Sequence, residues 1–514
     1  MTEKENIGLP NNVNRVVGKK AHEQNIQAAT FVAELIKSTL GPKGMDKLLI
    51  NPDGNITVTN DGVTILQEMQ IDHPAAKMIA EIAGTQENEV GDGTTTVAML
   101  AGKLLEHAGK LLKENIHPTI IVGGYRLAAI KAKEILEEIS TNCTEDDLKQ
   151  IAMTAMTGKG AEGNKEQLAE IILEALKIVE KTESPIENIK IENIKGDVSD
   201  SELVKGVVLD KEIPNEVMPK KIKDAKIALL DFGIENKNPE MDFQAQIQDP
   251  GQLDKFKESE KANLVEIIDK LKKEKITVVF TNKGIDDYAL SLLADYGIMG
   301  IRRISRYDME LLARSTSAKI LSDADQIKSG NLGSAGLVEQ IRNKNSSMIY
   351  VRDCDNPEAV TILIHGSSDY VMEEVKRAIT DGLGDVLASK DYKILPGGGA
   401  CEMAIALKLR EYAVTLSGRE QLAVEEFANV IETIPRTLAE NAGLDPINIL
   451  TELRKRHSSG EIVGLNLFNN KIEDTGKAGI IEPLKVKTQA IGSATEVATM
   501  ILRIDDLLMA KTTK

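Results

Sequence analysis

Residues 91–112 read GDGTTTVAMLAGKLLEHAGKLL, a glycine-rich loop that leads directly into a helix-like pattern. Apolar residues recur after the loop at spacings of three and four, which predicts a long amphipathic helix. The apolar face of this helix carries Val97, Leu100, Leu104, Leu105, Ala108, Leu111 and Leu112. The segment therefore predicts an element of a helical domain, with a special loop at its N-terminal end.

The loop at 91–96 has the features that a triphosphate-binding loop needs. Such a loop requires free backbone N–H groups, small residues that allow close approach, and the positive end of a helix dipole. The three threonines can add hydroxyl contacts, and Asp92 offers a hard oxygen ligand for Mg²⁺. An ordinary helix cap is the alternative, because Asp and Thr are common N-cap residues. The two glycines around Asp92 are more than a cap requires.

The chain contains no Gly-x4-Gly-Lys-[Ser/Thr] pattern, so it is not a P-loop NTPase. A second glycine-bounded turn at 40–44 is the candidate partner of the first loop, and it follows a predicted helix at 25–40. A simple helix terminator is the alternative for Gly41-Pro42. Asn60-Asp61-Gly62 and Asp381 also have ordinary local explanations, as a turn and as a solvated helix surface.

The rest of the chain alternates between helical and mixed regions. Short β-like runs at 47–50 and 55–59 predict a hairpin. The middle shows a βαβα rhythm, with apolar runs at 226–232, 276–281, 298–304 and 318–321 and helical stretches at 261–272 and 286–296. Long helices return at 419–441 and 488–509. This order predicts a helical domain split around an inserted α/β domain.

Residues 235–250 (ENKNPEMDFQAQIQDP) are polar and barely periodic, so we predict a mobile excursion from the α/β domain there. The length of 514 residues suggests about three domains.

The composition excludes several functional classes. Acidic residues outnumber basic ones 80 to 63, Trp is absent and aromatics are 3%, so nucleic acid is not an expected partner. No uncharged apolar run reaches the ~18 residues of a membrane span, and no signal peptide is visible, so we expect a cytoplasmic protein without membrane contact. Cys143, Cys354 and Cys401 lack disulfide or zinc spacing, which predicts reduced thiols.

Four motifs in their order and spacing resemble the chaperonin family. They are Leu40-Gly41-Pro42-Lys43-Gly44-Met45-Asp46-Lys47, Thr59-Asn60-Asp61-Gly62, the loop at 91–96, and Pro396-Gly397-Gly398-Gly399-Ala400. The resemblance extends to 439–446 and 486–491, so it covers nearly the whole chain. The stretch 230–261 and Ile116-His117-Pro118-Thr119 resemble group II, the archaeal and eukaryotic cytosolic type.

The resemblance implies a multidomain α+β fold. A mostly helical equatorial ATPase domain would be split around a small intermediate domain and an inserted α/β apical domain with a helical lid protrusion. The implied boundaries are 1–145 and 399–514 for the equatorial domain, 146–213 and 362–398 for the intermediate domain, and 214–361 for the apical domain with a lid near 234–262. The implied partners are non-native proteins and other copies or paralogues of the subunit in a back-to-back double ring.

The resemblance also assigns roles to individual residues. It implies a nucleotide site made of Leu40, Gly41, Pro42, Gly93, Thr94, Thr95, Thr96, Lys159, Gly398 and Glu482. Asp92 would hold Mg²⁺, with ATP as the nucleotide and K⁺ as an optional second cation. Asp61 and Asp381 would form the catalytic pair that positions and activates the attacking water.

Two of these assignments have further consequences. Lys159 resembles the lysine with which group II chaperonins sense the γ-phosphate, and a solvated loop lysine is its alternative. Asp381 is followed by Gly382 and Gly384, where the family usually has alanine or larger residues. Each glycine in a helix costs about 1 kcal/mol relative to alanine, which predicts a looser helix around Asp381.

Two other functions remain open at this point. A scaffolding ring would bind nucleotide without folding other proteins. A small-molecule kinase with a phosphate site other than a P-loop would be a monomer or dimer.

Overall fold

The computed structural model describes residues 13–510, apart from 52–53, 55, 70, 236–249, 344–345, 356 and 390–392. The chain divides into two compact units, residues 1–170 with 373–514 and residues 171–372. It leaves the first unit within α7 (Lys165–Val179) and returns within α11 (Asp369–Ser389). The first unit therefore combines both ends of the chain, and the second is one continuous segment.

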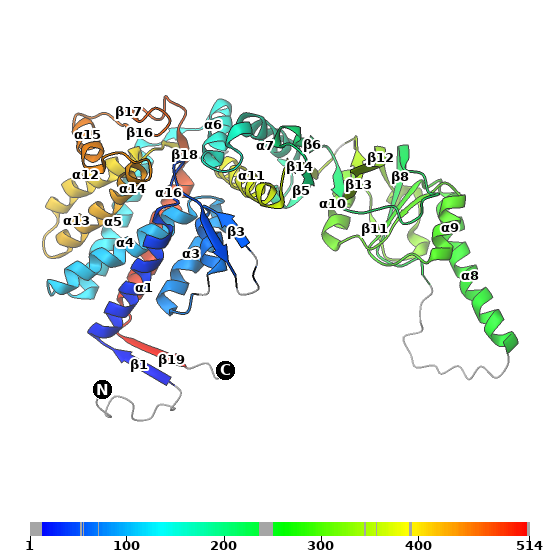
Figure 1. Ribbon diagram of the computed structural model, residues 1–514, viewed down its shortest axis with the longest axis horizontal. Helices are drawn as coiled ribbons and strands as arrows, with labels where there is room; N and C mark the ends of the chain where they lie inside the picture. Colours follow the sequence, from blue (N-terminus) through cyan, green and yellow to red (C-terminus); the bar gives the residue numbers. More distant parts are fainter. Residues whose placement is uncertain are drawn as a thin grey trace. The chain divides into compact units, whose positions relative to one another are not determined.

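Helices dominate the first unit (Figure 1). They are α1 (Lys19–Lys37), α2 (Gly62–Glu68), α3 (Pro74–Val90), α4 (Thr94–Lys113), α5 (Pro118–Ile139), α6 (Glu145–Met156), α12 (Ala400–Thr415), α13 (Glu420–Ile431), α14 (Thr433–Asn441), α15 (Pro446–Ser458) and α16 (Leu484–Leu502). α4 is the central element, because α1, α3, α13 and α16 all pack against it.

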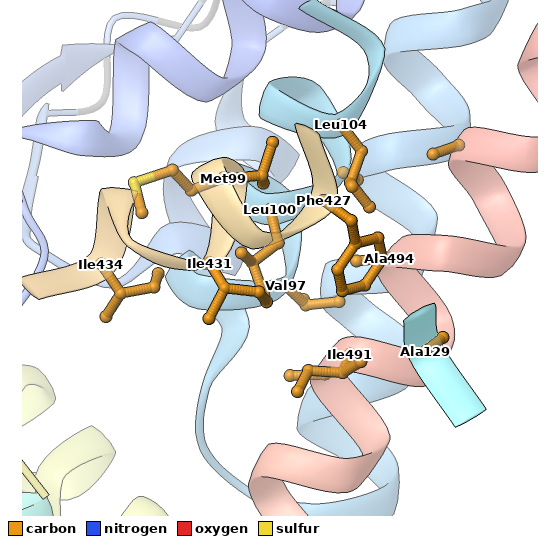
Figure 2. Packing of buried hydrophobic residues seen from close by; sticks show 14 of the residues in the cluster. Val97, Met99, Leu100, Leu104, Ala129, Phe427, Ile431, Ile434, Ile491 and Ala494 are labelled. Atoms are coloured by element: carbon orange, nitrogen blue, oxygen red, sulfur yellow. The ribbon is translucent and has the colours of Figure 1, made fainter. Parts of the chain in front are cut away.

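The hydrophobic core of the first unit is built on α4. Figure 2 shows Val97, Leu100 and Leu104 of α4 close to Phe427 of α13 and Ile491 of α16. Each buried side chain of this size contributes about 1.5–3 kcal/mol to folding. The sequence predicts an apolar face, but the first turns of α4 are enclosed on all sides, because neighbouring helices surround them.

Small sheets complete the first unit. The pairs are β1 (Val13–Val17) with β19 (Asp506–Ala510), β2 (Lys47–Ile50) with β3 (Ile56–Thr59), β15 (Lys393–Pro396) with both β4 (Thr141–Asn142) and β18 (Ile481–Pro483), and β16 (Gly464–Asn466) with β17 (Lys471–Glu473), all antiparallel. β1 and β19 bring the two ends of the described chain together (Figure 1).

A seven-stranded sheet forms the centre of the second unit. Its strands are β10 (Met299–Ile301), β9 (Val278–Thr281), β8 (Lys221–Leu230), β12 (Gly333–Asn343), β13 (Ser346–Arg352) and β7 (Val207–Leu209) in that order, with β11 (Ile320–Leu321) beside β8. The α-helices that lie wholly within this unit are α8 (Pro250–Lys273), α9 (Asp287–Asp295) and α10 (Arg306–Thr316), and the end of α7 also belongs to it. A second sheet joins β5 (Ile189–Lys195), β14 (Val360–Gly366) and β6 (Glu202–Val204).

Much of the predicted secondary structure is confirmed. The hairpin at 47–59 and the parallel strands β8, β9, β10 and β11 occur as expected. The antiparallel strands β12, β13 and β7 were not predicted. The fold is mostly helical with several sheets, which confirms the α+β class. The predicted boundaries of the three domains remain predictions.

Three predicted helices are confirmed in part, but their bounds differ. The predicted helix at 488–509 ends at Leu502, because its last residues form β19 against β1 from the opposite end of the chain. The predicted helix at 419–441 is two helices that meet at Glu432. The helix predicted at 25–40 begins six residues earlier, at Lys19, and ends at Lys37.

Other predictions concern the excursion, the cysteines and membranes. Most of the predicted excursion at 235–250, and with it much of the predicted lid, lies outside the described residues. Cys143, Cys354 and Cys401 are free thiols, as expected. Among the helices that the structure describes, none is both long and apolar enough to span a membrane.

Candidate functional site

A cavity of about 220 Å³ lies in the first unit at the N-terminal end of α4. The predicted site residues that line it are Leu40, Gly41, Pro42, Asp61, Asp92, Gly93, Thr94, Thr95, Thr96, Lys159, Gly398 and Glu482. Asp381 is bonded to Lys159 rather than placed in the cavity wall. The fold thus brings all the predicted residues to one place from distant parts of the sequence.

The N-terminus of α4 forms part of the cavity wall. Its N-cap residue is Gly93, which has a positive φ of 84°. No side-chain hydrogen bond caps the N–H groups of the first turn. The N–H groups of the first turn therefore keep their capacity to bind an anion. The alternative interpretation of the loop, an ordinary side-chain cap on this helix, is wrong.

Asp61 caps α2 from a position in the cavity wall. Its carboxylate accepts hydrogen bonds from Thr64 N at 2.8 Å, Thr64 Oγ1 at 2.7 Å and Thr94 Oγ1 at 3.0 Å. Residues 60–62 are therefore a helix start rather than a plain turn. The bond from Thr94 ties this cap to the first turn of α4, which fixes the carboxylate beside the proposed phosphate loop.

Lys159 lies in the loop after α6, and neighbouring loops fix its position. A Cβ on Gly158 would lie 2.5 Å from Pro42 Cα, and Asn60 Nδ2 donates to Gly158 O at 3.0 Å. The Lys159 ammonium donates to the Asp381 carboxylate on α11, and the two side chains are only 19% and 16% exposed. The alternative for Lys159, a solvated loop lysine, is therefore wrong.

The charges around this pair determine its protonation. Burial lowers the pKa of Lys159, but the carboxylates of Asp381, Asp92 and Asp61 outweigh burial and raise it. The pKa of Asp381 is raised to about 7, because burial and the carboxylates of Asp92 and Asp61, which raise it, outweigh Lys159, which lowers it. Lys159 therefore stays cationic, and the surrounding carboxylates are in excess of it.

α11 passes unusually close to the loop between α3 and α4. A Cβ on Gly384 would lie 2.7 Å from Gly91 Cα, and a Cβ on Gly91 would lie 2.7 Å from Gly384 Cα. The helix nevertheless runs unbroken from Asp369 to Ser389. The looser helix stays a prediction, but Gly384 has a packing reason, because its missing side chain allows this close approach.

Glu482 belongs to a buried ionic cluster behind the cavity. Lys487 Nζ lies 2.5 Å from Glu482 Oε2 and 2.8 Å from Glu402 Oε1. Burial lowers the pKa of Lys487, but the two carboxylates raise it well above its usual value, so the lysine is cationic. Lys487 thus holds the Glu482 carboxylate in a defined orientation at the cavity wall.

Two charged residues of the cavity wall, Asp385 and Lys487, were not among the predicted site residues. Asp385 had a detectable signal, because it follows Asp381 by four residues on one predicted helix. Lys487 also had a signal, because it lies in the stretch 486–491 and five residues after Glu482, whereas its second partner Glu402 is far away in sequence.

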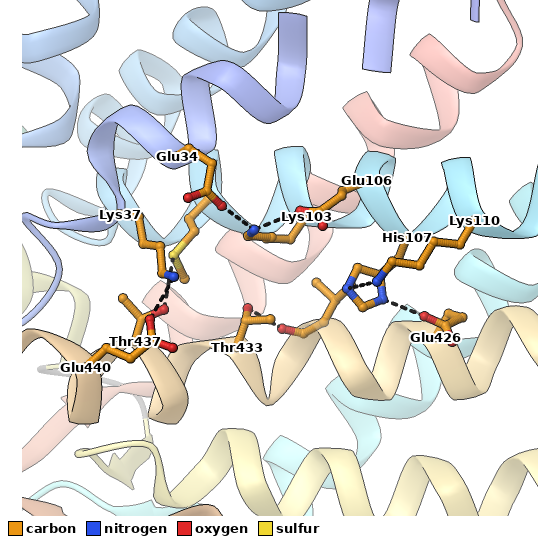
Figure 3. Close-up of polar contacts among 12 residues, drawn as sticks. Glu34, Lys37, Lys103, Glu106, His107, Lys110, Glu426, Thr433, Thr437 and Glu440 are labelled. Carbon is orange, nitrogen blue, oxygen red and sulfur yellow. Dashed lines mark hydrogen bonds and ion pairs between the residues drawn. The ribbon is translucent and has the colours of Figure 1, made fainter. Parts of the chain in front are cut away.

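A second polar hollow, of about 490 Å³, lies between α1, α4, α13, α14 and α15. We call it the ion-pair groove. Figure 3 shows Lys103 between Glu34 and Glu106, and His107 against Glu426. The His107 Nδ1 and Glu426 Oε2 atoms are 2.5 Å apart. Glu432 in this groove is 6% exposed and accepts from Arg410 and Arg454. Opposite charges are matched here within the fold itself.

Comparison with known proteins yields one consistent result. Residues 32–512 match the model of the TCP-1/cpn60 chaperonin family. The chain is 52% identical to the thermosome subunit beta of Archaeoglobus fulgidus, covering 97% of this chain and 93% of the relative. It is 50% identical to the thermosome subunit alpha of that organism and 49% identical to the thermosome subunit of Methanopyrus kandleri, each covering 98% of this chain and 94% of the relative.

Proposed function

The chain belongs to the TCP-1/cpn60 chaperonin family and is a group II chaperonin subunit, and from this premise we propose that its cavity binds and hydrolyses ATP. Hydrolysis would drive closure of a lid over a double-ring chamber in which non-native proteins fold. One observation carries the proposal. The uncapped N-terminus of α4 shares a cavity with the Lys159–Asp381 pair, so an anion-binding end meets potential catalytic groups.

The cavity wall suits a nucleotide with a metal-bound triphosphate. The first turn of α4 offers N–H groups and threonine hydroxyls to phosphate oxygens. Gly398 and Glu482 border the same cavity and would lie against the ribose and base. Asp92 supplies the oxygen ligand that Mg²⁺ prefers, and when bound Mg²⁺ neutralises phosphate charge. K⁺ is an optional second cation in this proposal.

Asp61 and Asp381 would orient and activate the attacking water. Phosphoryl transfer depends mainly on positioning and on neutralisation of charge. The Asp381 carboxylate is engaged by the Lys159 ammonium in this structure. A γ-phosphate would compete with Asp381 for the Lys159 ammonium. Once the ammonium has turned to the phosphate, the Asp381 carboxylate would be able to accept a hydrogen bond from water. Lys159 would in this way couple the presence of a γ-phosphate to activation of the site.

Ring assembly is supported by two β-ribbons in the first unit. The ribbon β2–β3 exposes Leu48 and Ile50 by 64% and 67%, and the ribbon β1–β19 exposes Leu508 by 55%. Isolated two-stranded ribbons with exposed apolar residues are marginally stable and favour contact with another chain. We propose that these ribbons contact neighbouring copies or paralogous subunits, and that the assembled ring works in the cytoplasm.

Three measurements on the full-length protein test the proposal. We expect ATP hydrolysis that requires Mg²⁺, ATP-dependent refolding of a denatured client, and light scattering from a particle of many subunits. Hydrolysis without refolding would favour the scaffolding ring. A particle of only one or two subunits would favour the small-molecule kinase, and either result would contradict the proposal.

A further inference from the structure

Asp385 is a buried carboxylate at the cavity that the proposed mechanism does not use. It follows Asp381 by one helical turn on α11, so the two residues share a face of the helix. It borders the cavity and is 4% exposed. Its Oδ1 atom has no hydrogen-bond partner among the described residues. An unpaired buried polar group costs roughly 1–3 kcal/mol, so this atom is expected to serve a bound group.

The backbone holds Asp385 beside the proposed metal ligand. Gly384 precedes it and contacts Gly91, the residue before Asp92, so closely that a Cβ on either glycine would clash. The segments carrying Asp385 and Asp92 are therefore pressed together. This approach requires glycine at both positions, and it brings α11 to the loop that precedes α4.

Neighbouring carboxylates disfavour a negative charge on Asp385. Asp92 has the strongest charge effect on Asp385, followed by Asp381, and both disfavour its ionised form. Lys159 acts in the opposite direction, but it is already bonded to Asp381. Burial raises the pKa of Asp385 well above its usual value, and these carboxylates raise it further. An added cation would offset this repulsion.

The chemistry of the site narrows the cation to a divalent one that arrives with phosphate. Within the part of the chain that the structure describes, no three Asp, Glu, His or Cys side chains could hold a metal by themselves. Mg²⁺ in nucleotide sites is typically bound through one or two carboxylates, with phosphate oxygens and waters completing its shell. A pair of carboxylates at the phosphate-binding end of α4 fits that pattern.

We propose that Asp385 is a second carboxylate partner, together with Asp92, of the divalent cation in the nucleotide complex. The inference rests on the proposed ATP site and adds a residue to it. Asp385 acts on the cation directly or through a bound water, and either route predicts the same dependence on its charge.

Manganese provides a direct probe of this role. Free Mn²⁺ can be followed by electron paramagnetic resonance while it is titrated into the full-length protein saturated with ADP. We expect Asp385→Asn to weaken Mn²⁺ binding about tenfold, the lower end of the range for groups that support a metal. ADP affinity in the presence of EDTA should stay within about twofold of the wild-type value, since the nucleotide contacts are retained.

Two control variants make the result interpretable. Asp369→Asn removes a carboxylate that is 79% exposed at the start of the same helix, and it should leave Mn²⁺ affinity unchanged. Asp92→Asn should weaken Mn²⁺ binding at least as strongly as Asp385→Asn. If the wild type shows no Mn²⁺ binding that depends on ADP, or Asp92→Asn has no effect, the proposed ATP site itself fails.

A different result would overturn the inference about Asp385 and leave the proposed ATP site intact. If Asp92→Asn binds Mn²⁺ more weakly but Asp385→Asn binds it with wild-type affinity, Asp385 does not act on the cation. Asp385→Ser provides a second, smaller substitution with the same expected loss. The metal-free melting temperature should stay equal or rise in both variants. Failure of both variants to fold would show that the fold itself needs the carboxylate, and would also overturn the inference.

Discussion

The cavity at α4 and the ion-pair groove are both rich in charge, but they treat it differently. In the groove, lysine, arginine and histidine side chains are matched with glutamates, as at Lys37–Glu440, which are 2.7 Å apart. At the cavity, carboxylates outnumber the cation that they share. The charge of Lys159 acts on Asp61, Asp92, Asp381 and Asp385. The two regions are nevertheless lined by a common helix, because α4 contributes residues to both.

This difference separates stabilising charge from functional charge. A buried charge that is fully paired within the protein is costly to break but has little capacity left for a ligand. A buried carboxylate without a partner costs stability until another group arrives. We therefore expect substitutions in the cavity to affect activity most and substitutions in the groove to affect stability most.

The largest expected effect is on hydrolysis. Asp381→Ala should lower the ATP hydrolysis rate by at least about 100-fold, because a group that activates water typically contributes 10²–10⁴-fold. Nucleotide affinity, measured by calorimetry, should change little, since Asp381 is not in the cavity wall. Glu440→Gln in the groove serves as the control and should hydrolyse ATP at the wild-type rate. Unchanged hydrolysis in Asp381→Ala would remove Asp381 from the catalytic pair.

The second effect is on stability. Glu432→Gln should lower the free energy of unfolding by at least about 2 kcal/mol, because it leaves Arg410 and Arg454 without their buried carboxylate. The estimate is at the low end because Arg454 is 47% exposed and partly solvated. Hydrolysis per folded subunit should be retained. Denaturant unfolding measures the loss, and Glu425→Gln on α13, the helix that ends directly before Glu432, is the matched control. A stable Glu432→Gln that had lost hydrolysis would reverse the comparison.

The third effect is a pH dependence of the nucleotide-free protein. The pKa of Asp381 is raised from 3.8 to about 7 by folding, chiefly through burial. The folded state therefore holds a proton that the unfolded state has lost, and this contribution to stability declines as pH rises from about 4 to about 7. Asp381→Asn lacks this decline, so its melting temperature should gain at least about 2 °C on the wild type between pH 5 and pH 8. If the difference in melting temperature between Asp381→Asn and the wild type were the same at pH 5 and pH 8, the raised pKa of Asp381 would be contradicted.

The smallest effect concerns His107 in the groove. Burial lowers the pKa of His107 more than Glu426 raises it, so the net pKa lies below 6.5. The unfolded state then binds more protons near pH 6, and stability rises with pH through that region. His107→Asn should flatten this rise by less than about 1 kcal/mol, which denaturant midpoints at pH 5.5 and 7.5 would detect. A steeper rise in the variant would show that His107 is charged in the fold.

Local sequence patterns predicted the elements that local interactions form. The helix α4, the hairpin β2–β3 and the parallel strands of the second unit follow from periodicity and turn residues within a few positions. The motifs also identified residues that the fold gathers around one cavity, although their roles there are still proposals. Predictions failed where a distant segment decides the outcome, as for β19, which pairs with β1.

The sequence patterns predicted most of the helices, several of the strands, the family that the chain resembles and the candidate residues of the site. Those properties depend on spacing of a few residues. How these candidates meet in space follows from the packing of segments that are distant in sequence. The contact of Gly384 with Gly91 arises because α11 packs against the loop before α4, and there the Oδ1 of Asp385 has no hydrogen-bond partner among the described residues. The Lys159–Asp381 pair forms because the loop after α6 also meets α11. No local pattern encodes this packing, since α11 and the loop before α4 are nearly three hundred residues apart.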